Sequence, residues 1–315
     1  DDAAAAVHGQ ERNARNAVPI NFAFVGPGRV GASLARRWSL AGMQCIGAVG
    51  RDEEKTLDAL AFVGAGRPLA PFELGESAAV VLIAVADQAL PEVVDRLVAE
   101  RAVRPCALWL HTSGVHGADV LAPAAAAGAR VAALHPLVPV PDRDQGCEAL
   151  SGQAALVEGP AAARHLLRTL CRRAGLHPVE VAGPIDRAAY HAACALAANG
   201  TTALLGLAAA MMGRALGVDD DRASGLAAGL ARAACERVGL EGAVRALSGP
   251  VLRGDAETVR QHLEVLARSG DPAGEDAYRS VMRLALGLAR QRGLGAAAAA
   301  EVERLLHSPL GGVHG

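Results

Sequence analysis

Short apolar runs alternate with helix-like segments along the first part of the chain. Seven runs have the length of a strand, and each ends at a glycine, a proline or a polar residue. Amphipathic helical patterns separate several of them, as in residues 29–42, 90–100 and 161–175. This alternation predicts the α/β class, a doubly wound, Rossmann-like and mainly parallel sheet with helices on both faces. The predicted strands are residues 20–26, 44–50, 79–86, 106–114, 130–137, 153–159 and 177–183.

The strand pattern ends after Pro184. Four helix-like segments follow, separated by turns rich in glycine and aspartate. The sequence therefore predicts a flexible tail over residues 1–18, an α/β domain over residues 19–183 and an all-helical second domain over residues 184–315. The four helical segments are residues 185–216, 222–238, 255–268 and 273–291.

Composition limits the classes of partner. Hydrophobic residues make up 51% of the chain and charged residues 20%, as in globular proteins, and the formal net charge is −2. Since the chain has no basic stripe with interleaved aromatic residues, we expect no nucleic-acid partner. The longest wholly apolar run, Ala78–Ala86, is too short to span a bilayer, so we expect no membrane partner.

Cysteine spacing and the first residues bear on compartment and metals. The six cysteines are scattered, without C-x-x-C pairs or histidines at zinc spacing, so we expect neither disulfides nor a bound metal. The first residues do not follow the order of a signal peptide, in which an apolar region comes after a basic start. Together these features predict a cytoplasmic protein.

A glycine-rich loop follows the first predicted strand. Gly26, Gly28 and Gly31 form the G-x-G-x-x-G pattern between a strand and a helix. In that context the glycines permit a tight turn, close approach of the backbone to a pyrophosphate, and close packing of helix on strand. We therefore expect a dinucleotide cofactor here, contacted also by Arg29 and Val30 of the same loop.

The end of the second strand bears on which dinucleotide binds. NAD enzymes usually place an acidic residue there for the ribose, but the chain has Gly50 followed by Arg51. A guanidinium at this position suits the 2′-phosphate of NADP, with Arg29 as a second contact, so we expect NADP. Asp52 leaves NAD open as the alternative. Ala86, at the end of the third strand, is also expected to line the cofactor.

An alanine-rich stretch carries polar residues at helical spacing. His191 and Asn199 lie eight residues apart, on nearly one face of a regular helix. They form either a buried hydrogen-bonded pair or the wall of a site. Two other polar segments, around Ser113 and His135, follow predicted strands and should lie near the nicotinamide.

The segments around Ser113, His135 and His191, together with "ALSGPVLRGDAETVRQHL" in the last third, resemble a bacterial family. Its members have a Rossmann-like N-terminal domain and a C-terminal domain long catalogued as of unknown function. Some members are described as an alternative type of 2-dehydropantoate 2-reductase, the ketopantoate reductase of pantothenate biosynthesis. More distantly the chain is similar to pyrroline-5-carboxylate reductase, prephenate dehydrogenase and the 6-phosphogluconate dehydrogenase group. The resemblance implies a helical domain that forms a homodimer.

The resemblance implies reduction of a carbonyl, which needs a proton donor. The related hydroxyacid dehydrogenases use a lysine in the long helix, whereas the only lysine of this chain is Lys55, after the second strand. His191 is therefore the first expected acid and His135, in a His-Pro pair like that of prephenate dehydrogenases, the second. Asn199 would orient the substrate or the ring.

Two further residues are expected at the substrate. A buried Arg253 would bind the substrate carboxylate, or else form an interdomain salt bridge. Ser113 would hold the nicotinamide amide or the carboxylate, or else serve only as a turn residue. The sequence thus predicts NADPH-dependent reduction of a small 2-oxo acid such as 2-dehydropantoate, with an imine or pyrroline carboxylate reductase and a non-catalytic NADP-binding regulator as alternatives.

Overall fold

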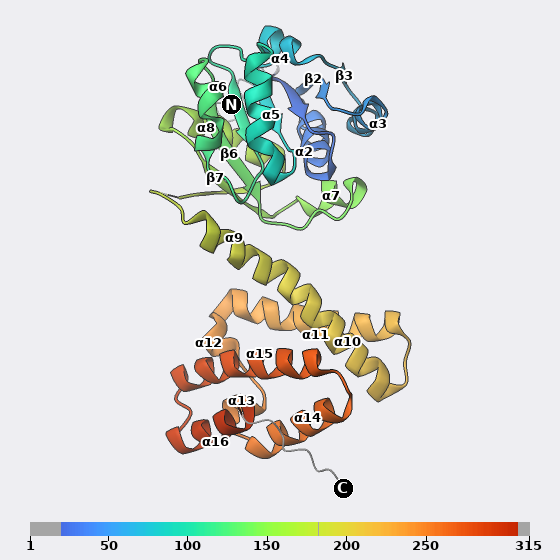
Figure 1. The fold of residues 1–315 in the computed structure, drawn as a ribbon, viewed down its shortest axis with the longest axis vertical. Coiled ribbons are helices and arrows are strands. Elements are labelled where there is room, and N and C mark those ends of the chain that lie inside the picture. The colour runs from blue at the N-terminus through green and yellow to red at the C-terminus, as the bar shows by residue number, and fades with distance from the viewer. Residues whose placement is uncertain (1–19, 182, 308–315) are drawn as a thin grey trace, which may run out of the picture. The chain divides into compact units, whose positions relative to one another are not determined.

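The computed structural model describes residues 20–181 and 183–307 (Figure 1). These residues divide into two compact units, and the boundary in the chain lies between Ala195 and Leu196. The expected tail over residues 1–18 lies outside the described residues. Each unit is considered by itself below.

An eight-stranded sheet is the centre of the first unit. Its strand order is β3-β2-β1-β4-β5-β6-β7-β8, and β1 to β6 run parallel to their neighbours. β7 is antiparallel to β6, and β8 is parallel to β7. The mainly parallel, doubly wound sheet is therefore confirmed. The strands are β1 (Asn21–Val25), β2 (Gln44–Val49), β3 (Arg67–Pro68), β4 (Val80–Ile83), β5 (Leu108–His111), β6 (Arg130–Pro136), β7 (Ala154–Glu158) and β8 (His177–Glu180).

Both faces of this sheet are buried, as the continuous apolar runs require. Alternate residues of each strand point to opposite faces, so Phe22 and Phe24 join one core cluster, whereas Ala23 and Val25 join another. Helices α2 and α8 cover the first face, and α5 and α6 cover the second. The helices that pack around the sheet are α2 (Arg29–Leu40), α3 (Glu53–Val63), α4 (Pro71–Ser77), η1 (Asp87–Ala89), α5 (Leu90–Ala99), η2 (Ala118–Leu121), α6 (Ala122–Ala126), α7 (Arg143–Ala149) and α8 (Ala161–Arg173).

The remaining described elements are helical, as expected after Pro184. Small alanines bring α10 and α11 close together, while a larger aliphatic cluster joins α13, α14, α15 and α16. α9 belongs to the first unit, and η3 opens the second. The bounds are α9 (Arg187–Ala195), η3 (Leu196–Gly200, a π-helical turn), α10 (Thr201–Leu216), α11 (Asp220–Glu241), α12 (Ala243–Ala246), α13 (Pro250–Arg253), α14 (Ala256–Arg268), α15 (Pro272–Gln291) and α16 (Ala296–His307).

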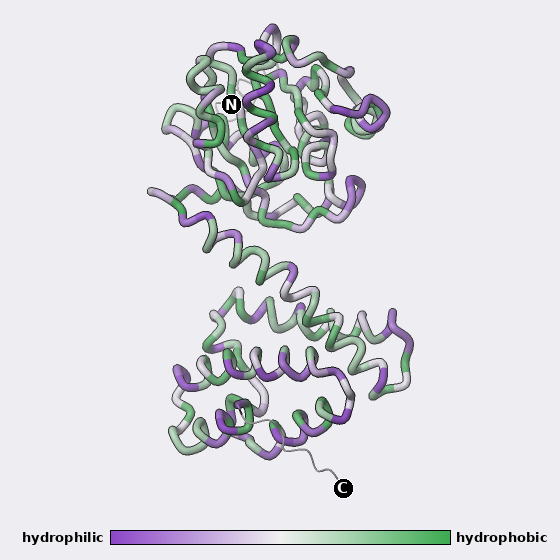
Figure 2. Tube along the Cα trace, in the orientation of Figure 1, coloured by the Kyte–Doolittle hydropathy of each residue, from purple (hydrophilic) through white to green (hydrophobic). Residues whose placement is uncertain are grey.

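The helical run from Arg187 to Leu216 is strongly apolar and little buried. By length and composition alone it could cross a membrane, with a mean hydropathy of 1.5 and 6% of its most apolar window buried. Figure 2 shows mainly hydrophobic residues along this run. One such helix is weak evidence for a membrane span, because helices of many other proteins meet the same criteria.

The sequence missed some elements. All seven predicted strands are present, but the two-residue β3 was not predicted because it is too short to show a period. The helix α16 was also not predicted, although its alanine run favours helix. The short turn η1, which starts at Asp87 and precedes α5, was not predicted either.

Candidate active site

The glycine loop between β1 and α2 has the geometry expected from its sequence. Gly26 has a φ of +91°, and a Cβ there would lie 2.5 Å from the carbonyl oxygen of Ala84. A Cβ at Gly31 would lie 2.7 Å from the carbonyl oxygen of Gly26. At Gly28, by contrast, the nearest atom would be 3.9 Å away. Two glycines are thus needed for packing, and the third keeps one side of the loop open.

This open loop fits a dinucleotide pyrophosphate. Gly28 is the N-cap of α2, no side chain caps the helix, and its first turn has no acidic residue. The backbone N–H groups and the positive end of the helix dipole are therefore available to an anion. Val30 is half-buried and packs against the hydrophobic core beside the loop. Arg29 is exposed, and its Nη1 donates a hydrogen bond to the carbonyl of Pro141 at 2.7 Å.

The end of β2 is shaped by Gly50 and Thr56. A Cβ at Gly50 would lie 2.1 Å from Thr56 Oγ1, so an acidic side chain cannot occupy this position. Asp52 caps α3 by accepting a hydrogen bond from the N–H of Lys55, and its carboxylate lies 3.4 Å from Lys55 Nζ. Arg51 is exposed and forms no ion pair or hydrogen bond among the residues that the structure describes. The guanidinium is thus available to an anion beside this strand end.

A buried histidine supports the turn after β5. His111 Nδ1 accepts a hydrogen bond from the N–H of Ser113, and its Nε2 lies 3.0 Å from the carbonyl oxygen of Gly117. Burial lowers the pKa of His111 to about 4, so the ring is neutral and Nε2 is the donor. Ser113 is itself buried, and its Oγ accepts from the N–H groups of Val115 and His116. Ser113 thus shapes the turn, while its hydroxyl proton remains available to a ligand.

His135 lies on β6, two strands from β4 in the same sheet. Its Nδ1 is 2.7 Å from the hydroxyl oxygen of Tyr190, and the two rings meet edge to face. Gly114 lies against the ring, since a Cβ there would be 2.8 Å from Cε1 and 2.9 Å from Nε2 of His135. The imidazole is therefore held between the turn after β5 and the first turns of α9.

Charged groups around His135 act on its protonation. Burial has the largest effect and lowers the pKa of His135 below its usual value. His191 and Arg187 of α9 lower this pKa further, whereas the carboxylate of Asp87 raises it. Arg187 forms an ion pair with Glu158 at the end of β7. The site thus favours a neutral His135 in the absence of a ligand.

Several expected site residues are not brought together within one unit. His191 is half-buried on α9 in the first unit, while Asn199 is exposed in the π-helical turn that begins the second. The side chain of Arg253 is 64% exposed, 3.9 Å from Asp255, and not buried as the sequence suggested. It is the last residue of the short α13. Ala86 is exposed after β4, at the sheet edge that carries the glycine loop.

The sequence did not identify Tyr190, Gly114 or Arg187 as site residues. Tyr190 is 55 positions from His135 in the chain, so spacing gave no sign of their contact. A tyrosine next to a histidine in an alanine-rich helix was the one available signal. Among the described residues, no group of three or more histidines, cysteines or acidic residues could hold a metal ion.

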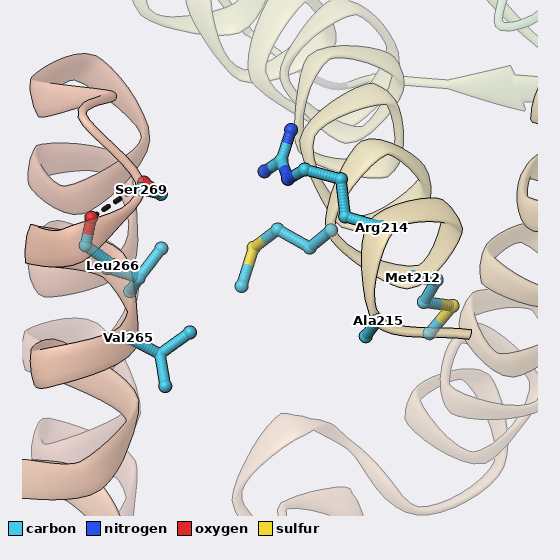
Figure 3. A pocket seen from close by; sticks show the side chains of 7 residues that line it. Met212, Arg214, Ala215, Val265, Leu266 and Ser269 are labelled. Atoms are coloured by element: carbon cyan, nitrogen blue, oxygen red, sulfur yellow. Dashed lines mark hydrogen bonds between the residues drawn. The ribbon is translucent and has the colours of Figure 1, made fainter. Parts of the chain in front are cut away.

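A cavity of about 390 Å³ lies within the helical unit (Figure 3). Met211, Met212, Arg214 and Ala215 of α10 line one side, opposite residues of α14 and its C-cap Ser269. Apart from Arg214 its lining is apolar or hydroxylic, and it contains none of the expected site residues. The lining of this cavity therefore holds no carboxylate and no histidine to act as a general acid.

The fold and the glycine loop define a Rossmann-like protein with a helical second domain. Residues 5–136 match the family described as a Rossmann-like domain. Residues 154–285 match the family described as a domain of unknown function, DUF2520. The combination of domains expected from the sequence is thus confirmed. No curated protein sequence is detectably similar to the chain.

Solved structures share this fold over nearly the whole chain. A candidate NADP oxidoreductase from Bacteroides fragilis is 20% identical, with a TM-score of 0.63 over 87% of this chain and 97% of that protein. An imine reductase from a Pseudomonas species is 18% identical, with a TM-score of 0.60 over 92% of this chain and 100% of that protein. A pyrroline-5-carboxylate reductase from Coxiella burnetii is 14% identical, with a TM-score of 0.58 over 91% of this chain and 99% of that protein. At these identities the likeness establishes the fold.

Proposed function

We propose that the protein is an NADPH-dependent reductase that acts on the carbonyl group of a small 2-oxo acid. The observation that carries the proposal is His135, held by Tyr190 on the sheet whose first strand leads into the open glycine loop. In sheets of this class the cofactor binds along the carboxyl ends of the strands. That arrangement supports a dinucleotide on the loop and a proton donor near the nicotinamide end.

The residues of the chain would divide the reaction among them. The loop and the N-terminus of α2 would bind the pyrophosphate, and Arg51 would bind the 2′-phosphate. Bound NADPH would supply the hydride for the carbonyl carbon. A protonated histidine would give its proton to the carbonyl oxygen and become neutral, which leaves the alcohol.

The choice of acid falls on a histidine because lysine is excluded. Lys55 is exposed and lies beside Asp52, at the strand end assigned to the adenosine part of the cofactor. His135 is the better supported acid, since the turn after β5 and Tyr190 fix its ring. His191 remains the second proposed acid, with Asn199 to orient the carbonyl, Ser113 as a further ligand of the cofactor or substrate, and Arg253 to bind the carboxylate.

The substrate is proposed from the resemblance and from this chemistry. We propose 2-dehydropantoate, of pantothenate biosynthesis, as the first 2-oxo acid to test. We also propose that the protein is cytoplasmic and forms a homodimer. The imine reductase and the pyrroline-5-carboxylate reductase with the same fold support reduction of a C=N group as the second candidate. A protein that binds NADPH without turnover would be a regulator.

One screen separates these functions. The purified protein is mixed with NADPH and a panel of 2-oxo acids and cyclic imines, and the loss of NADPH absorbance is followed. We expect turnover with at least one 2-oxo acid. Turnover of cyclic imines alone would favour the second candidate. NADPH binding without turnover of any compound would contradict the proposal and favour a regulatory protein.

A further inference from the structure

Two histidine–tyrosine pairs of nearly equal geometry occur among the described residues. His135 Nδ1 lies 2.7 Å from the Tyr190 hydroxyl, with ring centroids 5.7 Å apart. His262 Nδ1 lies 2.8 Å from the Tyr278 hydroxyl, with ring centroids 5.8 Å apart. His262 is exposed on α14, whereas His135 lies beside the turn after β5. The second pair therefore provides a matched control for the first.

The contact with Tyr190 distinguishes the two nitrogens of His135. Which nitrogen of an imidazole can serve a ligand is set by the hydrogen bond that the other nitrogen makes. The Tyr190 hydroxyl occupies Nδ1. Nε2 forms no hydrogen bond among the described residues, and it lies close to the backbone of Gly114, where a Cβ would be 2.9 Å away. Nε2 is thus the nitrogen of His135 left for a ligand.

We propose that Tyr190 is a positioning residue that holds Nδ1 of His135 and so makes Nε2 the nitrogen that passes a proton to the substrate. The catalytic part of this inference rests on the proposed function. In the protonated ring, Nδ1–H donates to the Tyr190 oxygen and Nε2–H faces the alkoxide. When the Nε2–H bond breaks, the alkoxide oxygen gains the proton, and the neutral ring keeps its Nδ1–H on Tyr190.

Tyr190 does not itself supply the proton. Burial, together with Cys194 one helical turn further on, raises the pKa of Tyr190, while Arg187 lowers it less strongly. The hydroxyl therefore stays protonated in the range where histidine titrates. It can accept from Nδ1–H of the charged ring and can also donate to a bare Nδ1, so it holds the ring in both protonation states.

Other ionisable groups must be counted in any pH dependence. His191 and Arg187 approach His135 from α9, and Asp87 approaches from η1. Replacing Tyr190 leaves these three groups in place. A change in the titration of His135 in a Tyr190 variant therefore reports on the lost hydroxyl.

The test compares Tyr190→Phe with Tyr278→Phe in the full-length protein. Selective ¹⁵N labelling of the ten histidines gives the tautomer and pKa of each ring. In Tyr190→Phe we expect altered ¹⁵N chemical shifts of the His135 ring. Misplacement of the ring should lower kcat by up to about 10²-fold. The inflection of the kcat-pH profile should move in the same direction as the pKa of His135. In Tyr278→Phe we expect changes at His262 only, with the parental kcat.

The outcomes separate this inference from the proposed function. Parental nitrogen shifts of His135 and a parental pH profile in Tyr190→Phe would overturn the role of Tyr190. If the shifts change but the parent reduces no compound, the hold on Nδ1 stands and the proposed function fails. Should Tyr190→Phe not fold, Gly114→Ala displaces the ring from its other side with Tyr190 intact, and parental His135 shifts and kcat there would overturn the inference.

Discussion

Thr56 Oγ1 lies where a side chain at position 50 would begin, 2.1 Å from the ideal Cβ position of Gly50. Thr56 is buried, and its hydroxyl donates to the carbonyl of Asp52 at 2.6 Å, so it is fixed within the first turn of α3. An acidic residue for the ribose of NAD therefore has no room at position 50. The neighbouring Arg51 is exposed and is available to a phosphate.

Arg51→Ala should weaken NADPH binding much more than NADH binding. The guanidinium interacts favourably with the 2′-phosphate, which NADH lacks. Loss of a charged hydrogen bond of this kind costs roughly 1.5–3 kcal/mol, or about 10- to 150-fold in the dissociation constant. Fluorescence titration with both cofactors measures the two constants.

Arg104→Ala is the matched control for the cofactor experiment. Arg104 is also exposed but precedes β5, at the opposite edge of the sheet from the glycine loop. It should leave both dissociation constants at their parental values. Equal losses for NADPH and NADH in Arg51→Ala would contradict a role in selecting the phosphate.

His135→Ala and His191→Ala together identify the acid. If His135 delivers the proton, its removal should lower kcat by roughly 10²- to 10⁴-fold, while NADPH affinity stays near the parental value. His191→Ala should then have a smaller effect, mainly through the lost charge near His135. The reverse order of the two kcat values would assign the proton to His191, and melting temperatures show whether either variant loses stability.

The rate should fall as pH rises through the pKa of the donating histidine. The acid form is the imidazolium, and its fraction decreases above the pKa. Because burial and neighbouring cations lower the pKa of His135, kcat/KM should decline from an inflection below the ordinary histidine value of 6.5. A pH profile of kcat/KM measures this inflection. A profile that is flat from pH 5 to 8 would exclude His135 as the acid.

His111 should make the folded protein sensitive to acid. Its pKa is about 4 in the folded state against 6.5 for the free group, so the unfolded chain binds a proton more readily between these values. The stabilisation is therefore complete above about pH 6.5 and is lost as pH falls towards 4. The difference corresponds to about 3 kcal/mol in the free energy of unfolding.

Urea unfolding at several pH values checks the role of His111. In the parent, the free energy of unfolding should fall between pH 6.5 and 4, and His111→Gln should reduce that dependence. Gln also has a donor and an acceptor for the contacts with Gly117 and Ser113. The idea fails if the two proteins lose stability equally over this range.

The helical unit should form a homodimer. Exposed leucines on α10 and α11, among them Leu204, Leu226 and Leu230, form an apolar surface of a kind that monomers seldom leave uncovered. A double change, Leu226→Glu with Leu230→Glu, should lower the mass measured by light scattering to that of a monomer. Leu40→Glu, on a leucine of the first unit that is even more exposed, should leave the mass unchanged. A monomeric parent at micromolar concentration would contradict the dimer.

Among the described elements, the sequence by itself determined every strand except the two-residue β3, the main helices except α16, and the glycine loop. These depend on local properties: apolar runs of strand length, the 3.6-residue period of a helix, and the freedom of Gly26 to adopt a positive φ. The change from strands to helices after Pro184 was predicted from the same local patterns. None of these features needs contacts between distant parts of the chain.

Only the tertiary structure decided which residues meet. It brought Tyr190 to His135 and Gly114 against the imidazole, because strand order and helix packing join segments that are far apart in sequence. It left the side chain of Arg253 64% exposed, at the last residue of the short α13. Residue spacing fixes neighbours within one helix or strand, whereas a hydrogen bond across 55 positions depends on how the whole unit packs.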